Sequence, residues 1–506
     1  MKLNAKRTVL VGLAFFLISA FWQMYDSVIP VLLTNKFGMS QTWSGVIMAL
    51  DNVLAVFMLP LFGALSDKCI GNRFGKRKPF IAIGTIVAVI ALSGLTFFDS
   101  AQLKKIEEVS IIDDPAALTI IYDTQSEKEL ITPEGEKFVL AEKFGKDEFV
   151  NIRSTDAGTD YTNYVSPARQ AYVADKTLES PNILIIFIGL LLVVLVAMAT
   201  FRSPAVALMP DVTVKPLRSK ANAVINLMGT AGGILVLVLG KVFATSSPKN
   251  ALMPYATFCG IVAAIMLSAL LIFLLTVREK TWSKQMQEDS VHYGVEEEKE
   301  ENTNKGKKLG KSELRSLIFI LLSIALWYFG YNAVTSKYAV YAGNILQKDY
   351  NTTLLIAQAA AIITYLPAGM VASKIGRKKT ILTGVVMLAL AFGGASFMRA
   401  SSPTWLMNVL FSLAGIAWAS INVNSFPMVV EMCSGGDIGK YTGFYYTASM
   451  SAQIATPVLS GFLMDNMGMT VLFPYAGLFV AGAFVTMCFV KHGDNKLVTK
   501  NIQSED

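Results

Sequence analysis

Long uncharged or nearly uncharged stretches recur along the whole 506-residue chain, separated by short polar segments. Crossing roughly 30 Å of hydrocarbon takes about 20 residues of α-helix, and each stretch is at least that long. The stretches are continuously apolar rather than alternating, so their backbones are expected to hydrogen-bond within helices and not within a β-barrel. The pattern predicts twelve membrane-spanning helices, at 8–34, 41–65, 79–98, 182–202, 219–244, 250–277, 314–343, 353–373, 379–398, 403–430, 441–464 and 470–490.

The two halves of the chain repeat one arrangement of hydrophobic helices and a basic turn. GALSDKCIGNRFGKRKP begins at Gly63 and GMVASKIGRKKT begins at Gly369. Trp22 precedes the first by 41 positions and Trp327 precedes the second by 42, so both halves keep one register. We therefore expect an all-α membrane protein of two pseudo-symmetric six-helix bundles. Their predicted ranges are 1–277 and 313–491, with a charged linker at 278–312 and a tail at 492–506.

One segment of the N-terminal half has no counterpart in the other half. It spans 99–180, between the third and fourth predicted helices. Apolar and polar residues alternate on both sides of Pro133 and Gly135, as in a β-hairpin. We expect a small β-rich domain outside the cytoplasm. It is either a decoration or a lid over the entrance to the bundle.

Composition and charge agree with a membrane protein. Hydrophobic residues make up 53% of the chain and charged residues 16%, with a mean hydropathy of +0.49. The net charge of +7 is accounted for by Lys and Arg in short turns, which the positive-inside rule places in the cytoplasm together with both termini and the linker. We therefore expect a multi-pass protein of the cell membrane. The turns are too short to form the extended basic patch that binds nucleic acid.

Clusters for catalysis or metal binding are not recognisable in the sequence. The four cysteines and two histidines are not spaced as metal ligands. No nucleophile with a base and no phosphate-binding loop occurs at a plausible depth. We expect no cofactor, no metal and no enzyme activity.

These motifs resemble the major facilitator superfamily over nearly the whole chain, except for the insertion. The longer form of the first basic turn, with PAVALMPD and RSKANAVINLMG after the fourth helix, is similar to sucrose/proton symporters and to glycoside-pentoside-hexuronide:cation symporters. The superfamily's turn reads G-x-x-x-D-R/K-x-G-R/K-R/K. Here it is occupied by Gly63, Asp67, Lys68, Gly75, Lys76 and Arg77, with extra residues inside.

The resemblance implies two bundles that rock about a central substrate site lined by the first, fourth, seventh and tenth helices. It also implies that charges at the basic turns latch the halves together. The plant sucrose symporters carry an aspartate in helix four, whereas the matching stretch here is apolar around Leu195. The gating residues implied are Gly63, Asp67, Arg73, Gly75, Arg77, Asp211, Arg218 and Glu431.

Two acidic residues, Asp26 and Asp51, lie inside the first and second predicted helices, at depths of roughly 10–15 Å. A carboxylate in hydrocarbon costs at least about 2.5–3.5 kcal/mol, so it usually faces a polar interior and often marks an ion path. We predict that both take part in proton coupling, with Asp26 the stronger candidate because it is on the first helix. The alternative for each is a structural, hydrogen-bonded carboxylate.

One basic residue, Lys337, lies well inside the seventh predicted helix. It either pairs with Asp26 or Asp51 or extends to the outer surface. We expect the second arrangement, because long basic side chains commonly reach the interface.

Aromatic and amide side chains gather on the first, second, seventh and tenth predicted helices. Sugars present an apolar ring face for stacking and hydroxyl groups that need paired donors and acceptors. The alternative for each residue is packing between helices or a place in the interfacial belt. The predicted substrate contacts are Trp22, Gln23, Tyr25, Asn52, Trp327, Tyr328, Tyr331, Asn332, Trp418 and Asn422.

These features together predict a secondary active transporter. The leading hypothesis is proton-coupled symport of a sugar or glycoside by alternating access, carried out by a monomer in the lipid bilayer. A drug or metabolite exporter on the same fold is the first alternative, and a membrane-embedded nutrient sensor is the second. A wide apolar cavity would favour the exporter, whereas a sensor would bind its ligand without accumulating it.

Overall fold

The computed structural model describes residues 3–69, 75–155, 159–214, 217–292, 310–430, 432 and 438–493. Two of the predicted gating residues, Arg73 and Glu431, lie outside these ranges, as do residues 293–309 of the predicted linker.

Every predicted span coincides with a long α-helix, and eleven of these helices are long and apolar enough to cross a membrane in the described part of the chain. The twelfth, α16, is 30 residues long and rich in hydroxyl side chains. The N-terminal half contains α1 (Ala5–Asn35), α2 (Gln41–Lys68), α3 (Lys78–Lys105), α8 (Asn182–Asp211), α9 (Arg218–Val242) and α10 (Ala256–Thr276). The C-terminal half contains α12 (Lys311–Tyr341), α13 (Tyr350–Ile375), α14 (Arg377–Ala395), α15 (Thr404–Val430), α16 (Ile438–Met467) and α17 (Leu472–Cys488).

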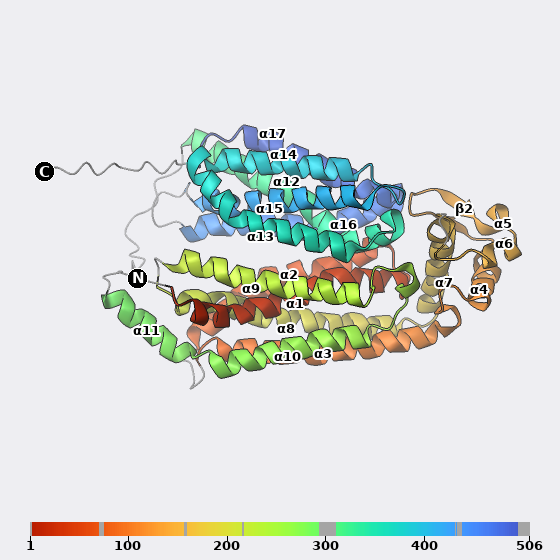
Figure 1. Cartoon of the computed structure of the whole chain (residues 1–506), viewed down its shortest axis with the longest axis horizontal. Helices are drawn as coiled ribbons and strands as arrows, with labels where there is room; N and C mark the ends of the chain where they lie inside the picture. The colour runs from red at the N-terminus through yellow and green to blue at the C-terminus, as the bar shows by residue number, and fades with distance from the viewer. Residues whose placement is uncertain are drawn as a thin grey trace.

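The helices form two bundles, each with a hydrophobic core of its own. In the N-terminal half α1 packs on α9 and α3 packs on α8, whereas in the C-terminal half α13 and α14 pack on α15. The halves meet through α2 with α16, α9 with α13 and α1 with α12. Figure 1 shows the C-terminal half, in cyan and blue, above the N-terminal half. The predicted all-α fold of two six-helix bundles is confirmed.

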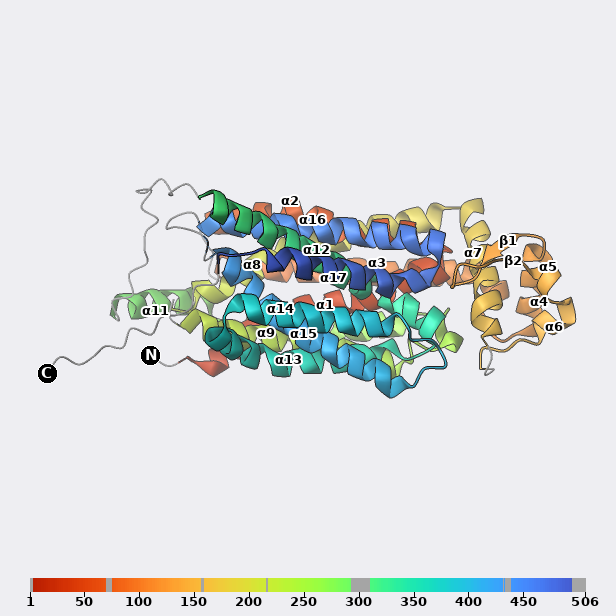
Figure 2. The ribbon, with the colours of Figure 1, turned by 90° about the horizontal axis from the view of Figure 1, so that it is seen from above.

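The insertion projects from one end of the bundles and has a separate hydrophobic core (Figures 1 and 2). The predicted hairpin is confirmed, because β1 and β2 pair antiparallel with Leu130 opposite Phe138. The prediction of a β-rich domain is wrong in extent, because the rest is mainly helical. Its helices and strands are α4 (Pro115–Gln125), β1 (Glu129–Ile131), β2 (Lys137–Val139), α5 (Leu140–Lys143), α6 (Lys146–Val150) and α7 (Ser166–Glu179).

The helical character of the insertion follows from start signals that the alternating pattern concealed. Asp114 Oδ1 accepts the Ala116 N–H at 3.2 Å, and Pro115 takes the first position of α4. An acceptor before a first-position proline is a strong helix start. Across the described chain, short 3₁₀ or π helices lie between the longer elements, at Glu107–Val109, Tyr161–Val165, Pro248–Asn250, Ala342–Leu346 and Met469–Val471.

Helix α3 extends beyond the predicted end of the third span. Asp99 was expected to start the insertion, but it is buried within α3 and forms an ion pair with Lys36 Nζ at 2.5 Å. The Tyr255 N–H also donates to Asp99, at 3.0 Å. Because its charge is compensated inside the protein, the helix continues to Lys105.

The opposite end of the bundles carries the basic turn between α2 and α3, together with the linker helix α11 (Glu279–His292) and the start of α1 (Figure 2). The Arg7 guanidinium lies 4.9 Å from the centre of the Trp282 ring and donates to the Trp282 carbonyl. Below, this end is called the basic-turn end and the other the insertion end.

Candidate functional site

At the insertion end, two charged residues of the C-terminal half hold the start of α2. The Asp465 carboxylate accepts the backbone N–H groups of Gln41 and Thr42 at 2.8 and 2.7 Å, and the Thr42 hydroxyl at 2.5 Å. Lys337 Nζ donates to the Gln41 carbonyl at 2.6 Å. Lys337 is fully buried. The expectation that it reaches the outer surface is therefore wrong, because its ammonium finds a carbonyl partner between the halves.

A second set of contacts joins α13 to the loop after α9. The hydroxyl groups of Tyr350 and Thr245 lie 2.8 Å apart, and Asn351 Nδ2 donates to Thr245 Oγ1 at 3.1 Å. Ser246 Oγ donates to Asp349 Oδ1 at 2.8 Å. These polar contacts close the same end of the molecule on its other side.

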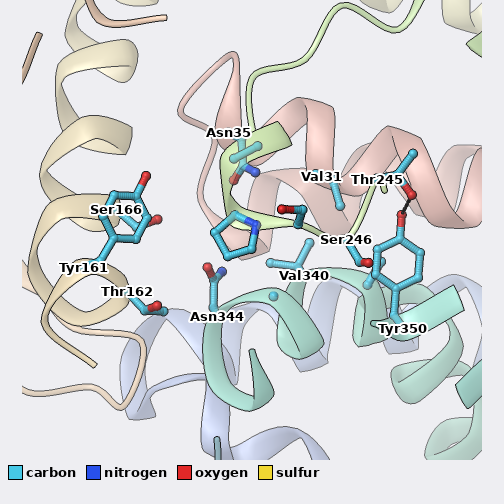
Figure 3. A pocket seen from close by; sticks show the side chains of 15 residues that line it. Val31, Asn35, Tyr161, Thr162, Ser166, Thr245, Ser246, Val340, Asn344 and Tyr350 are labelled. Carbon is cyan, nitrogen blue, oxygen red and sulfur yellow. Dashed lines mark hydrogen bonds between the residues drawn. The ribbon is translucent and has the colours of Figure 1, made fainter. Parts of the chain in front are cut away.

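The insertion takes part in this closure. Gln347 Nε2 in the C-terminal half donates to Thr162 Oγ1 at 2.8 Å, and the Met469 N–H donates to the Pro133 carbonyl at 2.6 Å. Figure 3 shows a pocket where the insertion and both halves meet, with a volume of about 60 Å³. That volume holds only about four to six water molecules, so this pocket between the halves is too small for a sugar.

Glycines allow α2 and α16 to approach closely at this end. A Cβ at Gly45 would collide with the Pro457 carbonyl of α16, and a Cβ at Gly461 would collide with the Gln41 carbonyl of α2. The two helices therefore meet backbone to backbone across the boundary between the halves.

At the basic-turn end, Arg77 links two predicted gating carboxylates. Its guanidinium lies 2.5 Å from Asp67 Oδ1 and 2.8 Å from Asp211 Oδ2. Burial lowers the pKa of Arg77, but its bonds to Asp211 and Asp67 raise it above its ordinary value. The group therefore stays charged, and it fastens α2 and α8 to the start of α3.

The linker supplies a cap that the sequence did not reveal. Glu279 accepts the backbone N–H groups of Lys76, Arg77 and Lys78 at 2.6, 2.9 and 2.9 Å. A carboxylate at this position complements the positive end of the α3 dipole. Gly75 precedes this cap with φ of +115°, which favours glycine.

The remaining described gating residues act within the N-terminal half. Arg218 donates to the carbonyls of Thr213 and Pro210 at 3.2 and 3.1 Å, at the end of α8. Gly63 brings α2 close to Ser203 of α8. The described latch residues thus tie helices of one half together in this conformation.

Between the two ends, charged residues of three N-terminal helices come together. Asp26 on α1 and Asp51 on α2 lie within electrostatic range of each other. The sequence had predicted similar depths for the two residues. Asn52 Nδ2 donates to Asp51 Oδ1 at 2.7 Å. Arg202 on α8 lies within electrostatic range of Asp51, and its guanidinium is 5.6 Å from the centre of the Trp22 ring.

Arg202 was not predicted as a site residue, because the fourth predicted span ended at this position. Helix α8 continues for nine residues more, through Pro204 to Asp211, so Arg202 lies about 13 Å inside the helix end. The useful signal was the apolar run PAVALMP after the arginine, which prolongs the span.

Facing these charges, the C-terminal half presents stacked aromatic rings. Tyr331 and Trp418 stack with centroids 3.6 Å apart and an interplanar angle of 3°, and Tyr328 meets Trp418 edge-on at 5.3 Å. The Asn422 side chain lies close to the Tyr365 hydroxyl of α13. Tyr328 and Tyr445, whose hydroxyl oxygens are 3.4 Å apart, extend the aromatic surface.

The two sets of residues face each other across the boundary between the halves. Tyr331 lies within electrostatic range of Asp26, and Tyr446 within range of Arg202. These side chains are at least partly exposed, not buried in the core of either half. We call this set the central cluster: Trp22, Asp26, Asp51, Arg202, Tyr331, Tyr365, Trp418, Asn422 and Tyr446.

Besides Asn52, which bonds to Asp51, four further predicted contact residues lie elsewhere or are already bonded. Trp327 and Tyr25 are fully buried in the cores of their own halves. Asn332 donates to the Tyr328 carbonyl of its own helix at 3.0 Å. Gln23 Oε1 accepts from Gln358 Nε2 at 2.6 Å, so this pair joins α1 to α13 across the boundary.

Comparisons with known proteins give the family. A model of the Major Facilitator Superfamily matches residues 171–361 and 349–505. The MFS-type transporter ppzB of Metarhizium rileyi (strain RCEF 4871) is 26% identical over 135 residues, and that of Metarhizium majus (strain ARSEF 297) is 28% identical over 135 residues. These matches cover 26% of this chain and 27% and 29% of the relatives' own lengths.

Solved structures share the fold over nearly the whole chain. The inward open xylose transporter XylE from E. coli is 15% identical, covers 98% of this chain and 97% of its own, and has a TM-score of 0.57. A bacterial homologue of the iron transporter ferroportin in an inward-facing state is 11% identical, covers 96% and 99%, and has a TM-score of 0.60. Because the family model spans more than half of its residues, the chain belongs to the Major Facilitator Superfamily.

Proposed function

We propose that this transporter is a proton-coupled symporter of a sugar or glycoside that works by alternating access. The observation that carries the proposal is the central cluster, where carboxyl groups of one half face stacked aromatic rings of the other. Sugars stack on aromatic faces and bond to amides, and carboxyl groups inside a membrane bundle can carry protons.

The arrangement of the two ends supports an inward-facing state. On this proposal the basic-turn end and both termini lie in the cytoplasm, as the positive-inside rule favours for the Lys and Arg of the basic turns. The polar contacts of Asp465, Lys337 and Asp349 then close the outer end. On this proposal the protein is a monomer of the cell membrane, and the insertion lies outside as part of the outer gate.

The proposed roles follow from position. Asp26 binds and releases the coupled proton, and Asp51 assists because it shares the electrostatic environment of Asp26. Trp22, Tyr331, Trp418 and Asn422 contact the substrate from the two sides. Asp67, Arg77 and Asp211 hold the N-terminal half as one rigid body during rocking.

Two structural neighbours agree with this choice of substrate, since one is named a xylose transporter and another a D-xylose-proton symporter. Their identities of 15% show a shared fold alone. The resemblance of the basic turn to sucrose and glycoside symporters points the same way.

Uptake of labelled disaccharides into proteoliposomes, with and without an inward proton gradient, tests the proposal. We expect at least one sugar to accumulate above its external concentration, and a protonophore to abolish the accumulation. Saturable binding without accumulation would instead identify a sensor, and gradient-driven expulsion from the vesicles would identify an exporter.

A further inference from the structure

Arg202 has no assigned task in sugar transport, yet it lies in the central cluster. Its guanidinium has five N–H donors and stays charged in any protein. Among the described residues, no hydrogen bond and no ion pair closer than 4.0 Å holds it, and its contact is with the Trp22 ring face at 5.6 Å. Its side chain is partly exposed in the bundle, so its N–H donors are accessible to a ligand.

The groups around Arg202 come from several helices. Asp51 of α2 and Tyr446 of α16 lie within electrostatic range of the guanidinium. Asp26 of α1 acts on Asp51, and Tyr331 of α12 acts on Asp26. The described cluster therefore contains two carboxyl groups and one guanidinium. Once both carboxyl groups are protonated, one positive charge remains for a ligand to neutralise.

From this geometry we infer that the substrate carries one carboxylate, as in an acidic sugar derivative, and that this carboxylate takes the free edge of the Arg202 guanidinium. The inference rests on the proposed symport function. A guanidinium fork matches a carboxylate with two parallel hydrogen bonds, while the Trp22 ring covers a face of the fork. A phosphate would bring nearly two negative charges against one guanidinium, so a carboxylate fits the charge balance better.

This assignment gives coupling a physical cause. The substrate carboxylate and the Asp51 carboxylate compete for the same cation. Protonation of Asp51 removes the competitor and admits the substrate, and loss of that proton towards the cytoplasm restores the competitor and favours release. The proton leaves the Asp51 carboxyl group for water, so charge and protons balance in each step. The loaded site is also closer to neutral, which costs less in a low-dielectric interior.

Matched disaccharide pairs test the inference in the full-length protein in proteoliposomes. Cellobiose against cellobionate and lactose against lactobionate each compare a neutral sugar with a carboxylated one. For at least one pair we expect wild-type kcat/KM to favour the acid by about ten- to hundredfold, the range of a hydrogen bond to a charged group. Equal or better transport of the neutral member in both pairs would overturn the inference and leave sugar symport standing. Transport of no sugar or sugar acid by folded protein would overturn both.

Variants of Arg202 separate a binding role from a structural one. Arg202→Gln should raise KM for the acid about ten- to hundredfold and raise KM for any transported neutral sugar much less. Arg202→Lys keeps the charge but not the fork, so it should lose less. Thermal unfolding of each purified variant checks folding. Equal losses for acid and neutral sugars in a folded Arg202→Gln variant would contradict the assignment.

Discussion

Asp465 in the C-terminal half accepts both the backbone N–H and the hydroxyl of Thr42, the second residue of α2 in the N-terminal half. A single side chain therefore caps a helix that belongs to the other bundle. Separation of the bundles at this end must break these bonds, which makes Asp465 a gate residue rather than a support for its own helix.

Asp465→Asn should favour the state that is open at the insertion end. An amide retains the size of the side chain but turns one acceptor into a donor and removes the charge, at a cost of about 1–3 kcal/mol to the closed state. Spin labels at Lys249 and Ser401 lie on loops of the two halves. The distance between them, measured by double electron–electron resonance, reports how far the halves separate. Asn466→Ala, which loses only a bond to the Phe462 carbonyl of its own helix, is the matched control. Identical distance distributions for wild type and Asp465→Asn would remove the residue from the gate.

The close approach of α2 and α16 depends on Gly45. In Gly45→Ala the added Cβ meets the Pro457 carbonyl, so the closed state should lose about 1–3 kcal/mol. The same pair of labels should show a larger open population. Gly260→Ala adds a methyl group with nothing within 4 Å, so it controls for the effect of alanine on a helix. A response of equal size in both variants would refute the steric explanation.

Acid should loosen the contact between Asp349 and Ser246. Burial raises the pKa of Asp349, but bonds from Thr352, Ser246 and Asn351 hold it below its ordinary value. Opening removes the Ser246 bond and raises this pKa, so protonation favours the open state. The contribution of Asp349 to closure is full above about pH 4 and is lost as pH falls through the closed-state pKa. Label distances recorded in an acid titration should show this step in wild type. Asp349→Asn should lack it.

The insertion should contribute to the outer gate through Thr162. Thr162→Val removes the acceptor of the Gln347 side chain and should weaken closure by about 1 kcal/mol. Thr119→Val, which removes a hydroxyl bonded only to the Pro115 carbonyl in its own helix, should leave closure unchanged. The rate of substrate exchange and the label distances measure the effect. If both variants behave like wild type, the decorative interpretation of the insertion holds.

The helices were predictable because long apolar runs have one stable form in a bilayer. The same reasoning misplaced helix ends at charged residues that lie inside a helix. Asp99 looked like a helix end until Lys36 supplied its counter-ion, and Arg202 looked like a membrane boundary until α8 proved longer. Burial and partners of charged residues depend on tertiary contacts, which hydrophobic patterns do not encode.

The type of site could be predicted from the sequence better than the individual residues that form it. Asp26, Trp22, Tyr331 and Trp418 lie in one cluster because polar and aromatic side chains on inner helices face the other half. Trp327 has the same composition signal but points into its own core. The face of the helix on which a residue lies decides whether it points to the other half or into its own core. A helix that is apolar on all sides gives no sequence signal that distinguishes these faces.

Transport by Asp26→Asn, measured in proteoliposomes against wild type, tests the central claim most directly. We expect the variant to exchange substrate across the membrane but to lose accumulation driven by an inward proton gradient, because the amide cannot carry the coupled proton. Glu148→Gln, in the exposed part of the insertion, should accumulate substrate like wild type. Accumulation at the wild-type level by Asp26→Asn would contradict the account.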